Sequence, residues 1–167
     1  AVTIGSILVN KYIFVIFLGL ILYQCYKEWI NINSKYFNKK NNKKKDQYFL
    51  IKIIGILYLI FVFFTTYSLR EDKAIYLIFI LSICAFSDIG GFFFGKIIGG
   101  KKLTKISPNK TISGSIGSFI FSIIPIFFFS TENFIILNFK VSLNTIIFAL
   151  IISLSCQIGD LVISYFK

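Results

Sequence analysis

The chain has 167 residues, of which 56% are hydrophobic, a formal net charge of +11 at pH 7 and a mean hydropathy of +0.81. Soluble domains hold about 45–50% apolar residues and rarely contain apolar runs of about 20 residues. The composition therefore excludes an ordinary soluble domain and favours a membrane protein. The chain contains no histidine, which excludes Ser-His and Cys-His catalysis and histidine-ligated metals. The three cysteines lie far apart in the sequence, and we expect them to be small packing residues.

Five apolar runs follow one another along the chain, at about residues 4–25, 48–69, 74–94, 115–129 and 141–158, the first of them interrupted by Asn10 and Lys11. A helical span needs roughly 20 apolar residues, and backbone groups in lipid must be paired within the segment. The runs are continuous, whereas a transmembrane β-barrel alternates polar and apolar residues. The predicted fold class is therefore all-α: a polytopic transmembrane helical bundle with about five spans, forming a single integral membrane domain over residues 1–167. We expect the chain to be truncated, because it lacks a starting Met and stops after an apolar segment.

Polar segments between the runs predict the orientation. Residues 35–47 contain six lysines and residues 96–110 contain five, whereas the segments at 70–73 and 130–140 contain few basic residues. Lysine-rich loops remain on the cytoplasmic side, which predicts cytoplasmic loops at about residues 31–47 and 96–113. Residues 70–73 are predicted to form a tight charged turn. The lysines of residues 35–47 are interpreted mainly as topology signals that contact anionic headgroups, and nucleic-acid binding is not expected because no soluble reading module is present.

Two of the seven acidic residues, Asp88 and Asp160, have apolar sequence on both sides. A charge at membrane depth costs about 2.5–3.5 kcal/mol on insertion scales and often marks function. The predicted topology places both near the cytoplasmic ends of their spans, beside the lysine-rich loop. Carboxylates with lysines suit a polyphosphate and a divalent ion, since Mg²⁺ keeps positions for water and substrate phosphates. Alternatively, each Asp caps a helix or pairs with a neighbouring lysine.

Small and polar residues form two helical stripes near these acids. Glycines spaced by four allow close helix approach in lipid, and here they predict packing of the third span against the segment that carries Asp160. The glycine stripe consists of Gly91, Gly95 and Gly99, and the polar stripe consists of Gln157, Asp160 and Ser164. The sequence of residues 107–111 predicts a turn. Thr111 or Ser113 would then cap the fourth helix, and the unpaired N–H groups of its first turn could bind an anion.

The segment "SDIGGFFFGKIIGGKKLTKISPNKTISGSIGS" resembles the core of the phosphatidate cytidylyltransferase family, the CDP-diacylglycerol synthases. The family carries an Asp followed by aromatic residues, Gly and a basic residue, and then Ser-Pro-x-Lys-Thr and a pair of glycines. "QIGDLVISYFK" resembles the family's Gln-x-Gly-Asp-Leu-x-x-Ser segment, and "YKEWINI" resembles its early Glu-Trp element. The chain departs from the pattern at Ser113, Ser118 and Ile163, and it stops where the family's C-terminal hallmark would continue. We therefore expect this fragment by itself to be inactive.

The resemblance implies a nucleotidyltransferase that moves a cytidylyl group from CTP to phosphatidate, giving CDP-diacylglycerol and diphosphate in phospholipid biosynthesis. It implies a multi-pass protein of the cell (inner) membrane, with Mg²⁺ as cofactor and the active site facing the cytoplasm. The expected catalytic residues are Asp88, Lys110 and Asp160, with Asp160 and Asp88 as metal ligands. The expected substrate-binding residues are Lys96, Ser107, Lys110, Thr111, Gln157 and Ser164.

Other functions remain open at this point. One alternative is a related CTP-dependent membrane lipid enzyme. Another is a fragment of a transporter with an acidic site inside the membrane, which predicts deep acids and inverted repeats. An inert helical assembly subunit would leave the two acids unexplained. The expected partners are CTP, phosphatidate and the lipid bilayer, and a homodimer is an open alternative.

Overall fold

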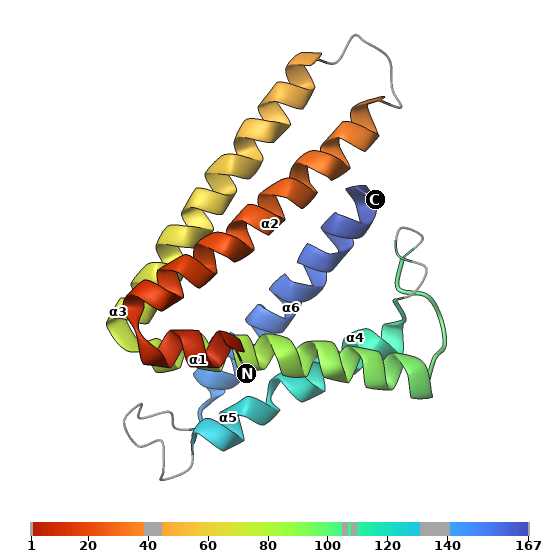
Figure 1. The fold of residues 1–167 in the computed structure, drawn as a ribbon. Helices are drawn as coiled ribbons and strands as arrows, with labels where there is room; N and C mark the ends of the chain where they lie inside the picture. Colours follow the sequence, from red (N-terminus) through yellow and green to blue (C-terminus); the bar gives the residue numbers. More distant parts are fainter. Residues whose placement is uncertain (1, 39–44, 105–106, 108–109, 131–140, 167) are drawn as a thin grey trace. The chain divides into compact units, whose positions relative to one another are not determined.

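The computed structural model describes residues 2–38, 45–104, 107, 110–130 and 141–166. Residues 39–44 of the first lysine-rich loop, 108–109 of the expected turn and 131–140 of the last connector lie outside these ranges. Every named element in the described ranges is a helix, which confirms the all-α prediction (Figure 1). The helices are α1 (Val2–Val9), α2 (Lys11–Asn38), α3 (Lys45–Ile97), α4 (Ile112–Ser122), α5 (Ile124–Phe129) and α6 (Leu143–Phe166).

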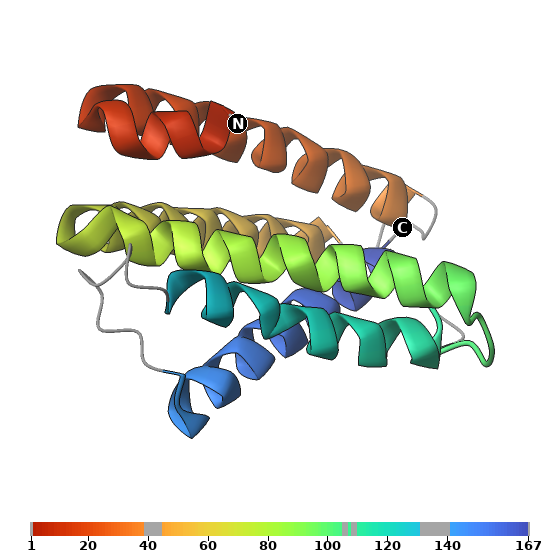
Figure 2. The ribbon, with the colours of Figure 1, turned by 90° about the horizontal axis from the view of Figure 1, so that it is seen from below.

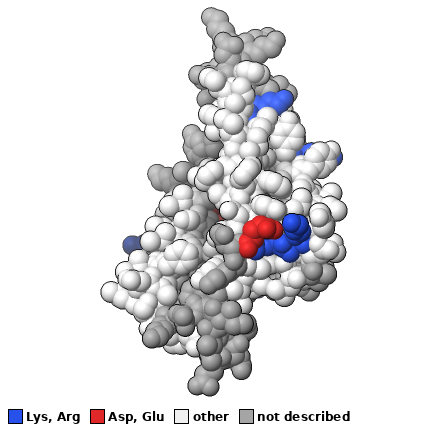
Figure 3. Space-filling model, turned by 90° about the vertical axis from the view of Figure 1, so that its left-hand side faces the viewer, with Lys and Arg blue, Asp and Glu red and all other residues white. Residues whose placement is uncertain are grey.

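Five helical segments are long and apolar enough to cross a membrane, as the sequence predicted. They are Lys11–Ser34, Phe49–Glu71, Ala74–Ile97, Ile112–Phe129 and Leu143–Ser164. On the face drawn in Figure 3, most of the described surface is uncharged. Such a surface suits helices whose outer sides contact lipid.

The first predicted span is wrong at its start, because Asn10 separates the short helix α1 from α2. The Asn10 side chain accepts a hydrogen bond from the Tyr12 backbone N–H at 3.1 Å, and its carbonyl accepts one from the Phe14 N–H at 3.0 Å. Asn favours this position because its side-chain oxygen satisfies an N–H group that the first turn of a helix leaves unpaired. The membrane-length segment consequently begins at Lys11 rather than near residue 4.

The predicted turn at residues 70–73 is wrong in conformation, because α3 is helical from Lys45 to Ile97. The predicted division into two spans is confirmed there, since one membrane-length segment ends at Glu71 and the next begins at Ala74. None of the four residues is Gly or Pro, and Arg, Glu and Lys have good helix propensity. Arg70 also has tertiary partners: its Nε donates to the Ile7 carbonyl at 3.3 Å, and its guanidinium lies 5.4 Å from the centre of the Phe14 ring. Charge alone therefore does not end this helix.

The chain divides into two compact units, residues 1–78 with 166–167, and residues 79–165. The first unit has a buried core of Ile7, Phe14, Leu18 and Leu77. The second has a core of Phe79, Ile83, Ile126 and Ala149, which joins the second half of α3 to α5 and α6. The description of residues 1–167 as a single integral membrane domain stays a prediction.

Glycines allow α3 and α4 to pack closely in the second unit, where the two helices run side by side (Figures 1 and 2). A Cβ atom added at Gly117 would lie 2.5 Å from Phe94 Cβ and 2.6 Å from the Gly90 carbonyl oxygen. A Cβ at Gly91 would lie 2.5 Å from Ser118 Oγ. The stripe that begins at Gly91 therefore packs on α4. The third span does pack against the helix that carries Asp160, as predicted, but through residues such as Ser87 and Ile83 rather than through the glycines.

Gly99 does not belong to this stripe, because α3 ends at Ile97 and a Cβ at Gly99 would meet no atom within 4 Å. Gly99 and Gly100 instead have φ values of +60° and +99°, a region that other residues rarely adopt. These two glycines turn the chain directly after α3. The turn leads into the lysine-rich loop that precedes α4.

Candidate active site

A short antiparallel bridge returns the lysine-rich loop to the start of α4. Lys102 pairs with Thr111, and the Leu103 N–H donates to the Lys110 carbonyl at 2.8 Å. The Thr111 hydroxyl then accepts from the Gly114 N–H at 3.1 Å and caps α4, as the sequence predicted. This backbone arrangement fixes Lys110 immediately before the first turn of the helix.

The expectation that the first turn of α4 offers free N–H groups to an anion is wrong for two of them. The Ile112 N–H donates to the Lys101 carbonyl at 3.0 Å, and the Gly114 N–H is taken by the Thr111 hydroxyl. The bridge between Lys102 and Thr111 causes this, because it carries the Lys101 carbonyl to the start of the helix. A phosphate at this site would depend more on side-chain cations than on the helix terminus.

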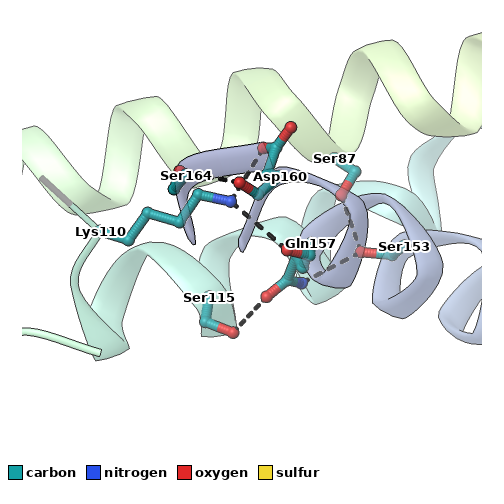
Figure 4. Close-up of polar contacts among 7 residues, drawn as sticks. All are labelled: Ser87, Lys110, Ser115, Ser153, Gln157, Asp160 and Ser164. Carbon is teal, nitrogen blue, oxygen red and sulfur yellow. Dashed lines mark hydrogen bonds and ion pairs between the residues drawn. The ribbon is translucent and has the colours of Figure 1, made fainter. Parts of the chain in front are cut away.

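Lys110 and Asp160 form an ion pair across the site, although they are 50 residues apart in the sequence. Lys110 Nζ lies 2.9 Å from Asp160 Oδ2 and 3.5 Å from the Gln157 carbonyl oxygen (Figure 4). The Asp160 side chain is 57% exposed, so its carboxylate is accessible to a ligand. Asp88, on the facing helix α3, lines the same pocket as Asp160 and Lys110. Two carboxylates and one ammonium therefore share a single polar centre.

Hydrogen bonds between polar side chains connect α6 to α4 and α3 next to this centre. The Ser115 hydroxyl donates to Gln157 Oε1, and Gln157 Nε2 donates to Ser153 Oγ at 3.4 Å (Figure 4). Ser153 is fully buried, and its hydroxyl lies 2.7 Å from that of Ser87 on α3. Unpaired polar groups are costly in an apolar interior, so this chain of hydrogen bonds favours one placement of α6 against α3 and α4.

The polar centre opens into a pocket of about 430 Å³ within the second unit. Its lining residues come from α3, the lysine-rich loop, α4 and α6. They are Asp88, Gly91, Phe92, Gly95, Lys96, Leu103, Lys110, Thr111, Gly114, Ser115, Ser118, Gln157 and Asp160. Part of the lining is apolar, and Lys96 Nζ lies 5.5 Å from the centre of the Phe92 ring. The pocket therefore combines charged groups with surface that an acyl chain can contact.

Six predicted site residues line this pocket: Asp88, Lys96, Lys110, Thr111, Gln157 and Asp160. Two others do not line it. Ser107 is buried, and its carbonyl accepts from the Lys110 N–H at 3.2 Å, so it shapes the loop. The Ser164 hydroxyl donates to the Asp160 carbonyl at 2.8 Å within its own helix. For both residues, binding of substrate stays a prediction without direct support from the geometry.

Sequence reasoning missed several residues of the site. Ser115 lies one turn after Thr111, and this spacing could have placed it on the same face of α4. Phe92 lies midway between Asp88 and Lys96 at intervals of four, so helical periodicity could have identified it too. Ser87 and Ser153 carried no local signal, because each is a single serine in an apolar run whose partner is 66 residues away.

The donor set fits a metal ion that is bound jointly with phosphate. Within the described parts of the chain, no three His, Cys, Asp or Glu residues group into a protein-only metal site. Asp88 and Asp160 do line one pocket together. Mg²⁺ is commonly held by one or two carboxylates, with water and substrate phosphates filling its other positions. These residues therefore match what a metal–nucleotide complex requires.

These features define a helical membrane protein whose pocket presents two acids and two lysines beside apolar surface. The chain belongs to the cytidylyltransferase family, whose model matches residues 35–167. The phosphatidate cytidylyltransferase of Staphylococcus saprophyticus is 34% identical over 118 residues, covering 69% of this chain and 44% of that protein. The one of Staphylococcus aureus strain COL is 36% identical over 126 residues, covering 73% and 45%. The chain thus spans less than half the length of these relatives. No solved structure matches it.

Proposed function

We propose that the full-length protein transfers a cytidylyl group from CTP to phosphatidate, releasing diphosphate and forming CDP-diacylglycerol. In this reaction a phosphate oxygen of phosphatidate bonds to the α-phosphorus of CTP, and the bond from that phosphorus to the leaving diphosphate breaks. The observation that carries the proposal is the pocket in which Lys110, Asp160 and Asp88 meet. The names of the relatives, which are called phosphatidate cytidylyltransferase, support it independently.

The pocket residues would act mainly by neutralising and aligning charge. Lys110 would contact CTP phosphates, exchanging its present bond to Asp160 Oδ2 for bonds to phosphate oxygens. Lys96 would supply a second cation from α3. Gln157 would act as a positioning residue, because its side chain joins α6 to Ser115 and Ser153. Preorganised charges of this kind stabilise the charge that develops in phosphoryl transfer.

Mg²⁺ is the proposed cofactor, and it would supply positive charge to the phosphates of CTP. Asp160 and Asp88 would hold it, since they are the two carboxylates of the pocket. The phosphatidate chains would lie toward the membrane, with Phe92 as one apolar contact at the pocket. The site would face the cytoplasm, where CTP is found, in a multi-pass protein of the cell membrane. A homodimer stays a prediction.

The function is tested with full-length protein in membranes that contain phosphatidate. With radiolabelled CTP and Mg²⁺, we expect label to enter a lipid that co-migrates with CDP-diacylglycerol, in equal amount to the diphosphate released. Omission of phosphatidate or addition of a Mg²⁺ chelator should abolish the product. Label that enters another lipid when phosphatidate is absent would contradict the proposed acceptor and indicate a different CTP-dependent lipid enzyme.

Replacing Lys110 with Ala should raise the KM for CTP more than it lowers kcat, and we expect about a tenfold effect on KM, equivalent to about 1.4 kcal/mol. The reason is that Lys110 supplies a point charge at the start of α4. Kinetics at several salt concentrations check this, because loss of the charge should weaken the salt dependence of KM. Lys101→Ala is the matched control, since Lys101 is exposed in the same loop and does not line the pocket. Equal KM changes in both variants would contradict a specific role for Lys110.

The predicted topology places the loops at about residues 31–47 and 96–113 together on the cytoplasmic side. Both predicted ranges overlap helices, because α2 extends to Asn38 and α4 begins at Ile112. The test therefore uses one position between α2 and α3 and one between α3 and α4. Single cysteines introduced at Lys101 and at residue 42, in a chain whose own cysteines are replaced by Ser, should react with an impermeant maleimide from the same side of sealed vesicles. Labelling of the two positions from opposite sides would refute this topology.

A further inference from the structure

Two cysteines that are 72 residues apart in the sequence meet inside the second unit. Cys84 on α3 and Cys156 on α6 are free thiols, and Cys156 Sγ donates to Cys84 Sγ at a separation of 3.1 Å. Both are half-buried, whereas Cys25, in the first unit, is exposed. The sequence predicted three unrelated packing residues, because the spacing of cysteines in a chain does not reveal which helices pack together.

The position of this pair relates it to the candidate active site. Cys84 lies one helical turn before Asp88, and Cys156 lies one turn before Asp160, so the thiols join the same two helices that carry the carboxylates. Neither cysteine lines the pocket. The nearby hydrogen bond between Ser87 and Ser153, at 2.7 Å, holds α3 against α6 at the level of the pair. The two sulfur atoms therefore meet at a fixed crossing of the helices.

We propose that Cys84 and Cys156 form a redox-active dithiol, which a lipid-soluble quinone oxidises to an intramolecular disulfide. Two S–H bonds break and one S–S bond forms. The two electrons and two protons pass to the quinone, which becomes a quinol. A disulfide has an S–S length of about 2.05 Å, so the sulfur atoms, now 3.1 Å apart, have to approach by roughly 1 Å.

A quinone is the oxidant that suits this location. Cys84 lies near the middle of the segment Ala74–Ile97, and Cys156 lies within Leu143–Ser164, so both thiols belong to segments long and apolar enough to cross the membrane. An apolar oxidant dissolved in the bilayer reaches such positions, whereas a charged one is excluded by the cost of burial. The resulting disulfide would be a covalent link between the helices of Asp88 and Asp160, one turn away from the pocket.

The test uses the reduced wild-type chain in lipid nanodiscs, with tetramethylbenzoquinone as the probe because its substituted ring does not add thiols. After treatment and denaturation, the free thiols are labelled with a polymer-conjugated maleimide, and the number of adducts is determined from the shift of the band on a gel. We expect three adducts before oxidation, one after it, and three again after reduction, since the chain has three cysteines. Peptide mapping should identify a Cys84–Cys156 peptide that has lost two hydrogen atoms. Three adducts after oxidation would overturn the proposal.

Single variants separate this pair from other pairings. Cys25→Ser should still form the cross-link, and its adducts should fall from two to none. Cys84→Ser should keep both remaining thiols free after oxidation. A disulfide that contains Cys25, or one that joins two chains, would overturn the intramolecular assignment. Because mapping of the wild-type chain decides the result, the proposal remains testable if a variant does not fold, and it does not depend on the proposed enzymatic function.

Discussion

Replacing Asp160 with Asn should reduce cytidylyl transfer by the full-length protein by at least about 10²–10³-fold, the usual effect of losing one electrostatic contact made in the transition state. The substitution keeps the shape of the side chain and removes the charge that would hold a divalent ion. It also removes the ionic partner of Lys110, which lies 2.9 Å from Asp160 Oδ2. The measurement is turnover of radiolabelled CTP in membranes at saturating Mg²⁺, with protein quantity and thermal stability determined in parallel.

Controls distinguish loss of the metal-binding charge from a general effect of neutralisation. Glu71→Gln removes an acid from the first unit that pairs with Arg70 at 3.6 Å and does not line the pocket, so its turnover should remain near that of wild type. Raising the Mg²⁺ concentration should partly restore an Asp160→Glu variant, which keeps the charge, but not Asp160→Asn. Near-normal turnover in well-folded Asp160→Asn would show that the carboxylate does not hold the metal.

Replacing Gly117 with Ala should lower the free energy of unfolding by about 1–3 kcal/mol, the typical cost of overpacking a core. The new Cβ would lie 2.5 Å from Phe94 Cβ and 2.6 Å from the Gly90 carbonyl oxygen, so α3 and α4 would have to separate. Because these two helices also carry Asp88, Lys96 and Ser115, their separation should widen the pocket and lower activity as well. Unfolding in mixed micelles with increasing SDS measures the change in stability.

Gly159→Ala is the matched control in the same unit. Gly159 also lies within a helix, and a Cβ added there would meet no atom within 4 Å. Ala is preferred to Gly in a helix by roughly 0.5–1 kcal/mol, so this variant should be as stable as wild type or slightly more stable. If Gly117→Ala unfolded at the same SDS concentration as Gly159→Ala, the close packing of α3 on α4 would be disproved.

The class of fold and most of the candidate pocket could be predicted from local features of the sequence. Long apolar runs specify membrane-length helices without any knowledge of packing, because their length and hydropathy are local properties. The acids Asp88 and Asp160 were identified in the same way, since charge inside an apolar run is costly. Motifs resembling the family added Lys110, Thr111 and Gln157, which the structure places in one pocket with the acids.

The residues through which the helices pair could not be predicted and became known from their packing. The spacing of Gly91 and Gly95 predicted a close contact but assigned it to the helix of Asp160, whereas these glycines pack on α4. Likewise, neither the Cys84–Cys156 contact nor the Ser87–Ser153 hydrogen bond could be predicted, because each joins residues more than 60 positions apart. Helical periodicity depends on neighbours three and four residues away, whereas the choice of partner depends on the fit of whole surfaces. Single small residues in apolar runs therefore acquire their roles only when the helices pack.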